Sequence, residues 1–302
     1  MAGLDSILSR RPPTTWDRFL SSPLLFLANC IYKSVSLSIE AEIRNPIRIV
    51  CISDTHNTHH DQPTIPSGDV LIHAGDLTQS GSVEELDNAL AWLNQQTHLN
   101  KIFIAGNHDV ALASADARER IPAGLSYLEN SSTEILVRGR KLHIYGSPNT
   151  PKHGSWPFQY PRVHPLLDAA NDNIWSSIPP QTDILITHGP PFAHLDLDEH
   201  YGCYSLLQRI WHVRPRLHVF GHIHAGRGVQ KIQWDQVQRA YEDVLAGRAK
   251  WGALLRLLWY TLMKWSAFGR TALFTELTTF ANAAAIGGLR DEERLGAVIV
   301  DL

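Results

Sequence analysis

Five short segments of this chain gather carboxylate, amide and imidazole side chains, most of them beside glycine. They are Asp54-Thr55-His56, Gly75-Asp76, Gly106-Asn107-His108-Asp109, Thr187-His188-Gly189 and Gly221-His222-Ile223-His224. Such a mixed set of oxygen and nitrogen donors, with no thiolate, favours Mn²⁺, Fe or Zn²⁺ over Ca²⁺ or a structural zinc site. The segments together predict a hydrolytic site that binds two divalent metal ions.

The residue types suit that chemistry. Two divalent ions about 3.5–4 Å apart can clamp a phosphoryl group and hold both the attacking and the leaving oxygen. Such a pair needs a shared anionic ligand, for which Asp76 is the best candidate. Asp54 and His56 are two residues apart in an extended turn, so both can reach one ion, and Asn107 offers a neutral oxygen. The imidazole ligands would be His188, His222 and His224.

Short apolar runs place these segments at strand ends. The runs cover residues 47–52, 69–74, 101–105, 141–145, 183–187 and 217–220. Leu86, Leu90 and Leu93 give residues 83–96 helical periodicity between two of the runs. Buried strands separated by helices indicate an α/β layered fold, and open α/β sheets bind ligands at the carboxyl ends of their strands.

The composition places few other constraints on function. The chain has 302 residues, of which 44% are hydrophobic, enough for one large domain with an appendage. A formal charge of -3 gives no general attraction to nucleic acid polymers or anionic lipid. The three cysteines do not have the spacing of a metal finger, and such a sparse, odd set fits a reducing compartment. We therefore expect a cytoplasmic protein, and both a peripheral membrane association and the oligomeric state stay open.

The segments, in this order, resemble the pattern of the calcineurin-like metallophosphoesterase superfamily: D-x-H, GD, GNH[DE], H and GHxH. The resemblance covers roughly residues 47–226. The wider sequence is similar to the smaller metallophosphoesterase-domain-containing (MPPED-like) branch. The similar stretches are residues 51–56, 69–76, 104–108, 184–191 and 213–221. The resemblance implies a four-layer αββα sandwich and hydrolysis of phosphoesters.

The resemblance also implies a ligand set for each ion. One ion would be bound by Asp54, His56, Asp76 and His224. The second would be bound by Asp76, Asn107, His188 and His222. A hydroxide bridging the two metals would be the nucleophile, because the ions depress the pKa of bound water.

Four residues are implied or expected to contact the substrate or to orient a residue that does. His108 would lie beside the scissile phosphate, as a general acid or as a donor that stabilises charge. Asp109 would orient it. Asn57, which follows the first segment closely, could touch phosphate together with Asn107 and His108, and a role for Asn57 in the turn is the alternative.

One departure bears on the substrate. Ser/Thr protein phosphatases of this superfamily carry an arginine in a GDxVDRG segment, and this arginine binds phosphate through two hydrogen bonds. Residues 75–81 of this chain contain no arginine. A phosphoprotein substrate is therefore disfavoured, and a small phosphodiester such as a cyclic nucleotide fits the branch better. The aromatic residues Trp156, Phe158 and Tyr160 could stack on a base, or could simply pack within their loop.

The whole chain is predicted to form two parts. Residues 1–45 are an N-terminal arm or helix packed on the domain, and residues 46–302 are the metallophosphoesterase domain. The domain carries a C-terminal helical insertion at about residues 229–275, with helices expected at 234–245 and 253–265. The second of these helices is apolar on nearly every side, so it must be buried against something. It could pack on its own domain and the apolar N-terminal stretch, on a membrane surface, or on a partner protein.

The other histidines are weaker candidates. His73 and His218 lie within predicted strands and are expected in the core or next to the ligands. Surface or rim positions are expected for His59, His60, His153, His164, His194 and His200.

Overall fold

The structure is a computed structural model that describes residues 14–35, 45–162, 174–198, 200–266, 276–288 and 290–302. It divides into two compact units. The larger comprises Ala41–Trp234 and Glu276–Leu302, and the smaller Met1–Glu40 and Asp235–Thr275. His164 lies outside the described residues, as do residues 1–13 and 36–44 of the predicted arm and residues 267–275 of the predicted insertion.

The first sheet of the larger unit is mainly parallel. Its strands are β1 (Arg48–Ile52), β2 (Val70–His73), β3 (Asn100–Phe103), β4 (Ser126–Tyr127) and β15 (Val298–Asp301). They are ordered β15-β1-β2-β3-β4, with β15 antiparallel to β1 and the other pairs parallel. Every residue of β2 is buried, as expected for a strand covered on both faces.

The second sheet of the larger unit also has a parallel centre. Its strands are β5 (Ser131–Val137), β6 (Arg140–Ser147), β9 (Ile184–Thr187), β10 (Leu217–Phe220), β11 (Gly228–Gln233) and β12 (Leu277–Asn282). They are ordered β11-β12-β10-β9-β6-β5, and the outer strands β11 and β5 are antiparallel to their neighbours. The apolar runs predicted from the sequence therefore form the centres of both sheets.

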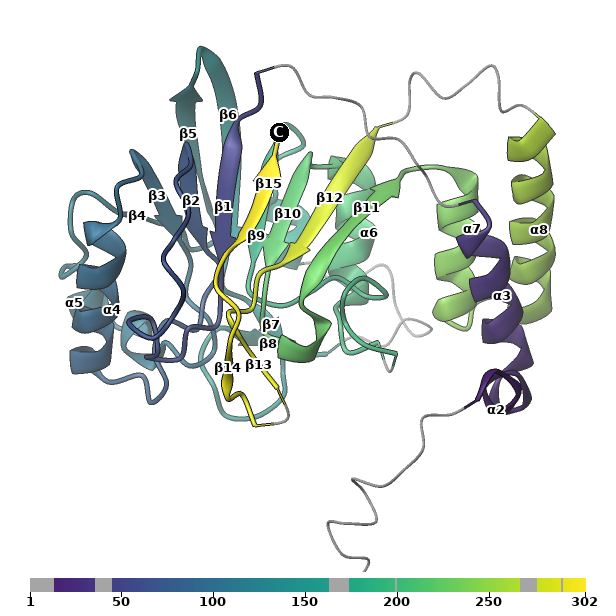
Figure 1. The fold of residues 1–302 in the computed structure, drawn as a ribbon, viewed down its shortest axis with the longest axis horizontal. Coiled ribbons are helices and arrows are strands. Elements are labelled where there is room, and N and C mark those ends of the chain that lie inside the picture. Colours follow the sequence, from purple (N-terminus) through teal and green to yellow (C-terminus); the bar gives the residue numbers. More distant parts are fainter. Residues whose placement is uncertain (1–13, 36–44, 163–173, 199, 267–275, 289) are drawn as a thin grey trace, which may run out of the picture. The chain divides into compact units, whose positions relative to one another are not determined.

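Helices cover the outer faces of the two sheets (Figure 1). They are α4 (Val83–Gln95) and α6 (Tyr204–Val213). Leu86, Leu90 and Leu93 of α4 join a buried cluster with the first sheet, and α6 packs similarly on the second sheet. A third cluster, including Ile72 and Ile186, lies between the sheets. These layers confirm the expected αββα sandwich.

Shorter elements connect the layers. They are η1 (Val110–Ala113), α5 (Ala115–Arg118), β7 (Thr150–Pro151), β8 (Gln159–Tyr160), η2 (Ile174–Ser177), η3 (His224–Gly226), β13 (Ile286–Gly287) and β14 (Glu293–Arg294). β7 pairs with β8 in parallel, and β13 pairs with β14 in an antiparallel manner.

The described part of the smaller unit is helical. It contains α2 (Thr15–Ser21), α3 (Pro23–Lys33), α7 (Gln236–Leu245) and α8 (Lys250–Ser266). Ala28 of α3 is buried with Val244 of α7 and Leu257 of α8. The apolar N-terminal stretch and the insertion helices thus share one small core. Within the described residues, no helix is both long and apolar enough to cross a membrane.

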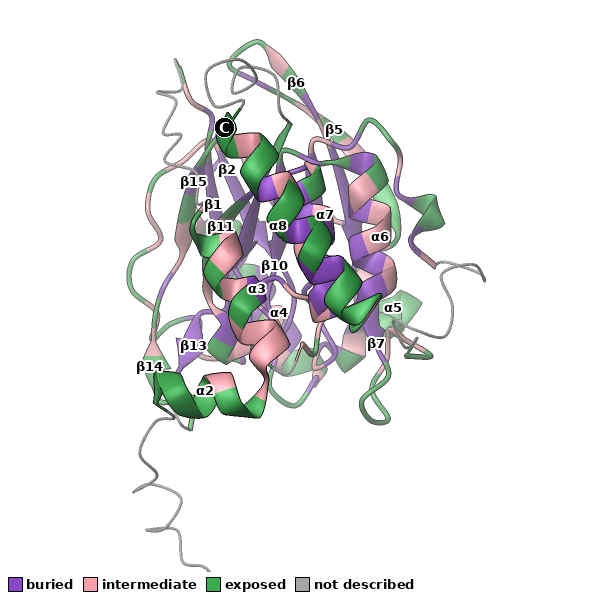
Figure 2. Ribbon diagram, turned by 90° about the vertical axis from the view of Figure 1, so that its right-hand side faces the viewer, coloured by how far each residue is buried: buried purple, intermediate pink, exposed green. Residues whose placement is uncertain are grey.

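Only one face of α8 is buried in this small core. Its buried residues are Ala253, Leu254, Leu257 and Thr261. Large apolar side chains remain exposed on the rest of the helix, much of which is green in Figure 2. They are Trp251, Leu255, Leu258, Trp259, Leu262, Met263 and Trp265.

Candidate metal centre

Loops at the carboxyl ends of strands in both sheets deliver the predicted ligands. Asp54 follows β1, Asp76 follows β2 and Asn107 follows β3. From the second sheet, His188 follows β9, and His222 and His224 follow β10. Because the two sheets pack face to face, ligands from both converge at one edge of the sandwich.

The backbone at these positions is strained. Left-handed φ angles of 52°, 41°, 53° and 66° occur at Asp54, His56, Asp76 and His222. Residues with a side chain rarely adopt positive φ, and such strain is typical of functional sites. Glycine is needed beside them: a Cβ on Gly221 would lie 1.9 Å from Asp54 Oδ2, and one on Gly106 would lie 2.2 Å from Asp76 Oδ1. The glycines of the sequence segments therefore make room for the carboxylates.

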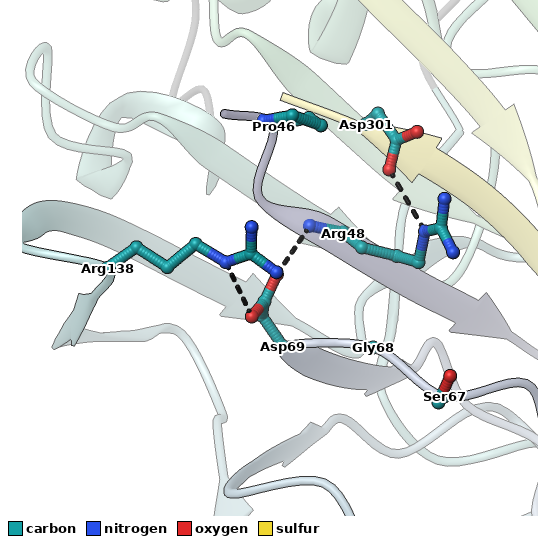
Figure 3. Close-up of a pocket in the computed structure, with 7 residues that line it drawn as sticks. All are labelled: Pro46, Arg48, Ser67, Gly68, Asp69, Arg138 and Asp301. Carbon is teal, nitrogen blue, oxygen red and sulfur yellow. Dashed lines mark hydrogen bonds and ion pairs between the residues drawn. The ribbon is translucent and has the colours of Figure 1, made fainter. Parts of the chain in front are cut away.

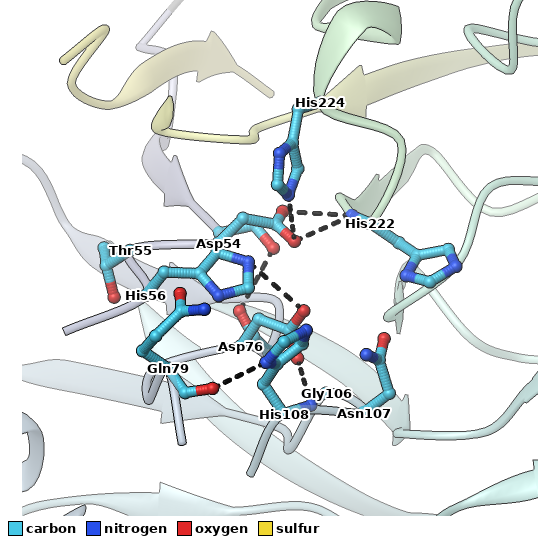
Figure 4. A network of polar contacts seen from close by, with 12 residues as sticks. Asp54, Thr55, His56, Asp76, Gln79, Gly106, Asn107, His108, His222 and His224 are labelled. Carbon is cyan, nitrogen blue, oxygen red and sulfur yellow. Dashed lines mark hydrogen bonds and ion pairs between the residues drawn. The ribbon is translucent and has the colours of Figure 1, made fainter. Parts of the chain in front are cut away.

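The side chains form three overlapping groups of possible ligands in the described chain. The groups are Asp54, His56 and His224; His56, Asp76 and His108; and Asp76, His188 and His222. In each group the donor atoms lie within 4.8 Å of one another. Figure 4 shows side chains of this cluster converging around Asp54 and Asp76. Asp76 and His56 each belong to two groups, and Asp76 is the one whose carboxylate could be shared by two ions.

Distances within the cluster suit metal binding. Asp76 Oδ2 lies 3.5 Å from His56 Nε2 and 3.2 Å from His188 Nε2. Asn107 Oδ1 lies 3.1 Å from the same nitrogen of His188. His224 Nε2 lies 3.5 Å from Asp54 Oδ1. The predicted ligands thus lie together, with donor atoms close enough to surround bound cations.

The His56 ring provides a separate test of fit. Both of its nitrogens are buried, and neither has a hydrogen-bond partner in the described part of the chain. Burial also lowers the pKa of this imidazole, which keeps it neutral. A neutral buried nitrogen with no partner is costly unless something binds it. A divalent cation between His56 and the carboxylates would satisfy it.

Opposite charges compensate one another in the cluster. Burial alone would raise the pKa of Asp76, but His188 and His56 outweigh burial and hold the pKa well below its usual range. Burial alone would lower the pKa of His188, but Asp76 and Asp54 outweigh burial and raise it to about 9. Since metal-binding imidazoles are neutral, protons must leave such histidines when cations bind.

Neighbouring groups orient the ligands. His188 Nδ1 lies 2.9 Å from the Ala74 carbonyl oxygen, so its Nε2 faces the cluster. His224 Nδ1 lies 2.9 Å from Asp291 Oδ1. A carboxylate behind a metal-binding histidine fixes the ring and increases its basicity. The sequence did not predict this role of Asp291, because the residue stands in a charged run that is typical of a solvated loop.

His108 lies at the edge of the cluster, and its ring is 4.6 Å from that of His56. Its backbone N–H donates to Asp76 Oδ1 at 2.7 Å. Its Nδ1 lies 2.7 Å from the backbone carbonyl oxygen of Gln79, which makes Nδ1 the donor and leaves Nε2 for the site. The contact that orients His108 therefore comes from Gln79, a residue that the sequence did not indicate.

Asp109 organises the loops instead of contacting the His108 ring. Its carboxylate accepts from the N–H groups of Gly106 and Thr78 at 2.8 Å and 2.9 Å, and from the Thr78 hydroxyl at 2.8 Å. Burial, and then the Asp76 charge, raise its pKa to about 6. The orienting contact predicted between Asp109 and His108 is thus replaced by bonds that join the loops after β2 and β3.

Asn57 occupies a turn. Its φ is 60°, and its backbone N–H donates to the Leu77 carbonyl at 2.9 Å. The side chain is exposed. This geometry shows the turn role, and the contact with phosphate stays a prediction.

The other histidines divide into three kinds. His73 and His218 are buried and bond to Thr55 and Thr187, at 3.1 Å and 2.8 Å. The rim position expected for His153 is observed, with its ring 4.7 Å from that of His222. His60 and His200 are not buried, whereas His59 and His194 are, contrary to the expectation of a surface position.

A cavity of about 420 Å³ lies apart from this centre, at the amino ends of β1 and β2 (Figure 3). Its charged residues pair with one another: Arg48 Nε donates to Asp301 at 3.2 Å and Arg138 Nε donates to Asp69 at 2.9 Å. Because its cations and carboxylates already neutralise one another, the cavity has little excess charge to attract an ionic ligand.

The chain is similar in sequence to two curated proteins. The chain is 44% identical over 315 aligned residues to "Probable rhamnogalacturonate lyase C" of Emericella nidulans, covering 99% of this chain and 29% of that protein. It is 39% identical over 209 residues to human "Metallophosphoesterase domain-containing protein 1", covering 60% of this chain and 62% of that protein. This chain therefore spans less than two thirds of either relative.

A similar solved structure is that of the protein TT1561 from Thermus thermophilus. The two chains share 15% identity with a TM-score of 0.43, over 62% of this chain and 85% of the other.

The family assignment rests on a match to a family profile. Residues 47–226 match the sequence profile of the calcineurin-like phosphoesterases. This region contains the described ligands from Asp54 to His224, and it makes up more than half of the chain. The chain therefore belongs to the calcineurin-like phosphoesterase family.

Proposed function

We propose that this protein is a dinuclear metallophosphodiesterase that hydrolyses small phosphodiesters such as cyclic nucleotides. The observation that carries the proposal is the position of Asp76 Oδ2, within 3.5 Å of His56 Nε2 and 3.2 Å of His188 Nε2. One carboxylate oxygen thus faces ligands expected on different ions. The lyase name of the Emericella nidulans protein is not transferred, since this chain covers only 29% of it.

Each side chain has a proposed task. One ion would be held by Asp54, His56, Asp76 and His224, and the other by Asp76, Asn107, His188 and His222. When bound, Mn²⁺, Fe or Zn²⁺ would supply Lewis acidity and activate water near neutral pH. His108 would protonate the leaving oxygen or stabilise its charge through Nε2, because the Gln79 carbonyl holds Nδ1.

The loop after β2 favours a diester over a monoester. A monoester dianion is well matched by a forked arginine, whereas a diester carries a single negative charge. Gln79 and Ser80 lie in the segment where protein phosphatases of the superfamily have their arginine. The backbone carbonyl of Gln79 faces His108 instead. The segment thus offers no cationic side chain to stabilise the second negative charge that a monoester carries.

The test compares a bis-aryl phosphate with the matching mono-aryl phosphate, using protein loaded with Mn²⁺ or Zn²⁺. We expect the diester to be hydrolysed with a kcat/KM at least about tenfold higher, a difference of about 1.4 kcal/mol in transition-state binding. Chelation of the metals should abolish both activities, and adding metal back should restore them. A preference for the monoester would overturn the diesterase assignment. Metal-loaded protein inert to both esters would favour a non-catalytic scaffold.

We propose as a second function that α8 docks on an anionic membrane surface. Leu255, Trp259 and Trp251 are 67%, 61% and 57% exposed. Residues 250–266 include three basic residues and no acidic one. Helices of this kind lie in the membrane interface, where tryptophan and leucine enter the lipid and basic side chains meet anionic headgroups. Arg256 and Lys264 also pair with Asp243 and Asp235, at 3.2 Å and 2.6 Å, so the exposed apolar side chains carry most of this proposal and the basic residues add a weaker preference for anionic lipid.

Vesicle flotation tests this docking with the full chain. Wild-type protein should float with phosphatidylcholine vesicles containing phosphatidylserine, and less with phosphatidylcholine alone. The double variant Leu255→Glu and Trp259→Glu should remain at the bottom of the gradient. A matched control is Leu136→Glu, at an exposed position of β5, which should float like wild type. Wild-type protein that fails to float, or that self-associates through α8 in solution, would exclude the membrane proposal.

A further inference from the structure

The loop between β7 and β8 is fixed at both ends. The Thr150 N–H donates to the Phe158 carbonyl at 2.9 Å, and the Lys152 N–H donates to the Tyr160 carbonyl at 2.8 Å. Together with the parallel pairing of β7 and β8, these bonds constrain the chain between them. The side chains in this loop are thus held by the backbone near the metal cluster.

Trp156 projects from this loop onto His108. The two ring centroids are 4.6 Å apart, and the ring planes differ by 30°. A Cβ on Gly154 would lie 3.1 Å from two indole atoms, so glycine allows the indole to approach the backbone closely. Despite these contacts, Trp156 is 39% exposed. The indole therefore leaves part of its surface open to solvent beside the proposed general acid.

The two other aromatic residues of this loop face different surroundings. Tyr160 donates its hydroxyl to Cys203 Sγ at 2.9 Å, and its ring lies 5.6 Å from that of Trp175. Phe158 packs against the cluster between α4 and the first sheet. Of these three aromatic side chains, Trp156 is the one in contact with an imidazole of the metal cluster.

The position of His108 determines which part of a substrate would meet Trp156. A general acid lies next to the oxygen of the leaving alcohol, because it donates its proton there. A group carried by that alcohol would then lie beside the exposed indole. Stacking of a base on an aromatic side chain is favourable and tolerates any base, because every base has a π face.

We propose that Trp156 forms a stacking subsite for an aromatic ring, and that the leaving alcohol of the substrate carries a nucleobase. This inference rests on the proposed phosphodiesterase function and narrows it to nucleotide diesters. Trp156 is a specificity residue in this scheme: it binds the base and takes no part in proton transfer.

The test combines binding with turnover in metal-loaded protein. The variants are Trp156→Ala, Trp156→Phe and the control Trp16→Ala, which removes an exposed indole from α2. Calorimetry measures the binding of AMP. Turnover is measured with 2′,3′-cyclic AMP and with glycerophosphocholine, a diester that has no aromatic ring.

We expect Trp156→Ala to weaken AMP binding and raise KM for the cyclic nucleotide by about tenfold or more, as loss of a base stack should. Its KM for glycerophosphocholine should stay within about twofold of wild type, a change below about 0.5 kcal/mol. Trp156→Phe should retain most of the affinity, and Trp16→Ala should match wild type.

Other results have distinct meanings. Equal losses on both diesters would show that Trp156 acts through His108, and would overturn the stacking subsite. Hydrolysis of glycerophosphocholine without measurable AMP binding would also overturn it, while leaving the phosphodiesterase proposal intact. If wild type hydrolyses neither diester, the proposed function fails, and the AMP affinities of the Trp156 variants still decide whether the indole binds a base.

Discussion

Asparagine in place of Asp76 is expected to abolish metal-dependent hydrolysis and to weaken metal binding throughout the cluster. Asp76 belongs to two of the three possible ligand groups, and its Oδ2 faces both His56 and His188. The substitution preserves shape but removes the negative charge that two ions would share. Metal affinity should fall by more than the roughly 10–100-fold cost of losing a partner that only orients a ligand. Titration with Mn²⁺ and turnover of a bis-aryl phosphate measure both effects.

The other end of the same strand provides a matched control. Asp69 precedes β2, and its carboxylate accepts from the Arg48 N–H at 2.8 Å and from Arg138 Nε at 2.9 Å. Asp69→Asn should lose some stability but keep both metals and full turnover. If Asp76→Asn binds two ions as tightly as wild type does, Asp76 is not the shared ligand, and the proposed arrangement of the centre is wrong.

The ligands of this centre could be predicted because each is encoded locally. Asp54, Asp76 and Asn107 follow short apolar strands, and Asp76 and Asn107 each come directly after a glycine, so both the strand end and the polar side chain can be recognised. The steric reason for the glycines is long-range by contrast: a Cβ on Gly221, which follows β10, would meet Asp54, which follows β1. Parallel strands place their carboxyl ends at one edge, so the pattern alone indicates that the ligands converge.

The groups that orient those ligands could not be predicted in this way. Asp291 lies 67 residues after His224, which it contacts. The Gln79 carbonyl is a backbone group 29 residues before His108, and every residue has one. The sequence does show Trp156, but its contact with His108 depends on how the β7–β8 loop folds over a different strand end. Such contacts depend on tertiary packing.

The helical insertion also has features that the sequence predicted and features that it did not. Its apolar periodicity predicted helices at residues 234–245 and 253–265, and the structure has them at Gln236–Leu245 and Lys250–Ser266. The later start of α7 has a local cause, because the Asp235 side chain accepts from the Gln238 N–H as an N-cap. The apolar pattern of α8 did not reveal which of its faces is buried, because apolar residues surround nearly the whole helix.

Removal of the His108 side chain is expected to lower turnover while leaving metal binding intact. General acid catalysis contributes about 10²–10⁴-fold, so His108→Ala should lose kcat by about that factor. His108 also belongs to one possible ligand group, so a metal titration of the variant is required. His60→Ala is a suitable control, because His60 is exposed and lies 3.1 Å from the side-chain oxygen of Asn88. Loss of one ion in His108→Ala would instead make His108 a ligand.

The loss of kcat in His108→Ala should depend on the leaving group in a way that separates two roles for His108, general acid and charge stabiliser. A p-nitrophenolate departs readily without a proton, whereas an alkoxide needs one. If His108 is the general acid, His108→Ala should be far more damaging for an alkyl diester than for a p-nitrophenyl diester. If His108 only stabilises charge on the phosphoryl group, both substrates should lose the same factor, because that charge is common to both. The Gln79 carbonyl is compatible with either role, since it holds the Nδ1 proton and directs Nε2 toward the site, so the leaving-group comparison decides between them.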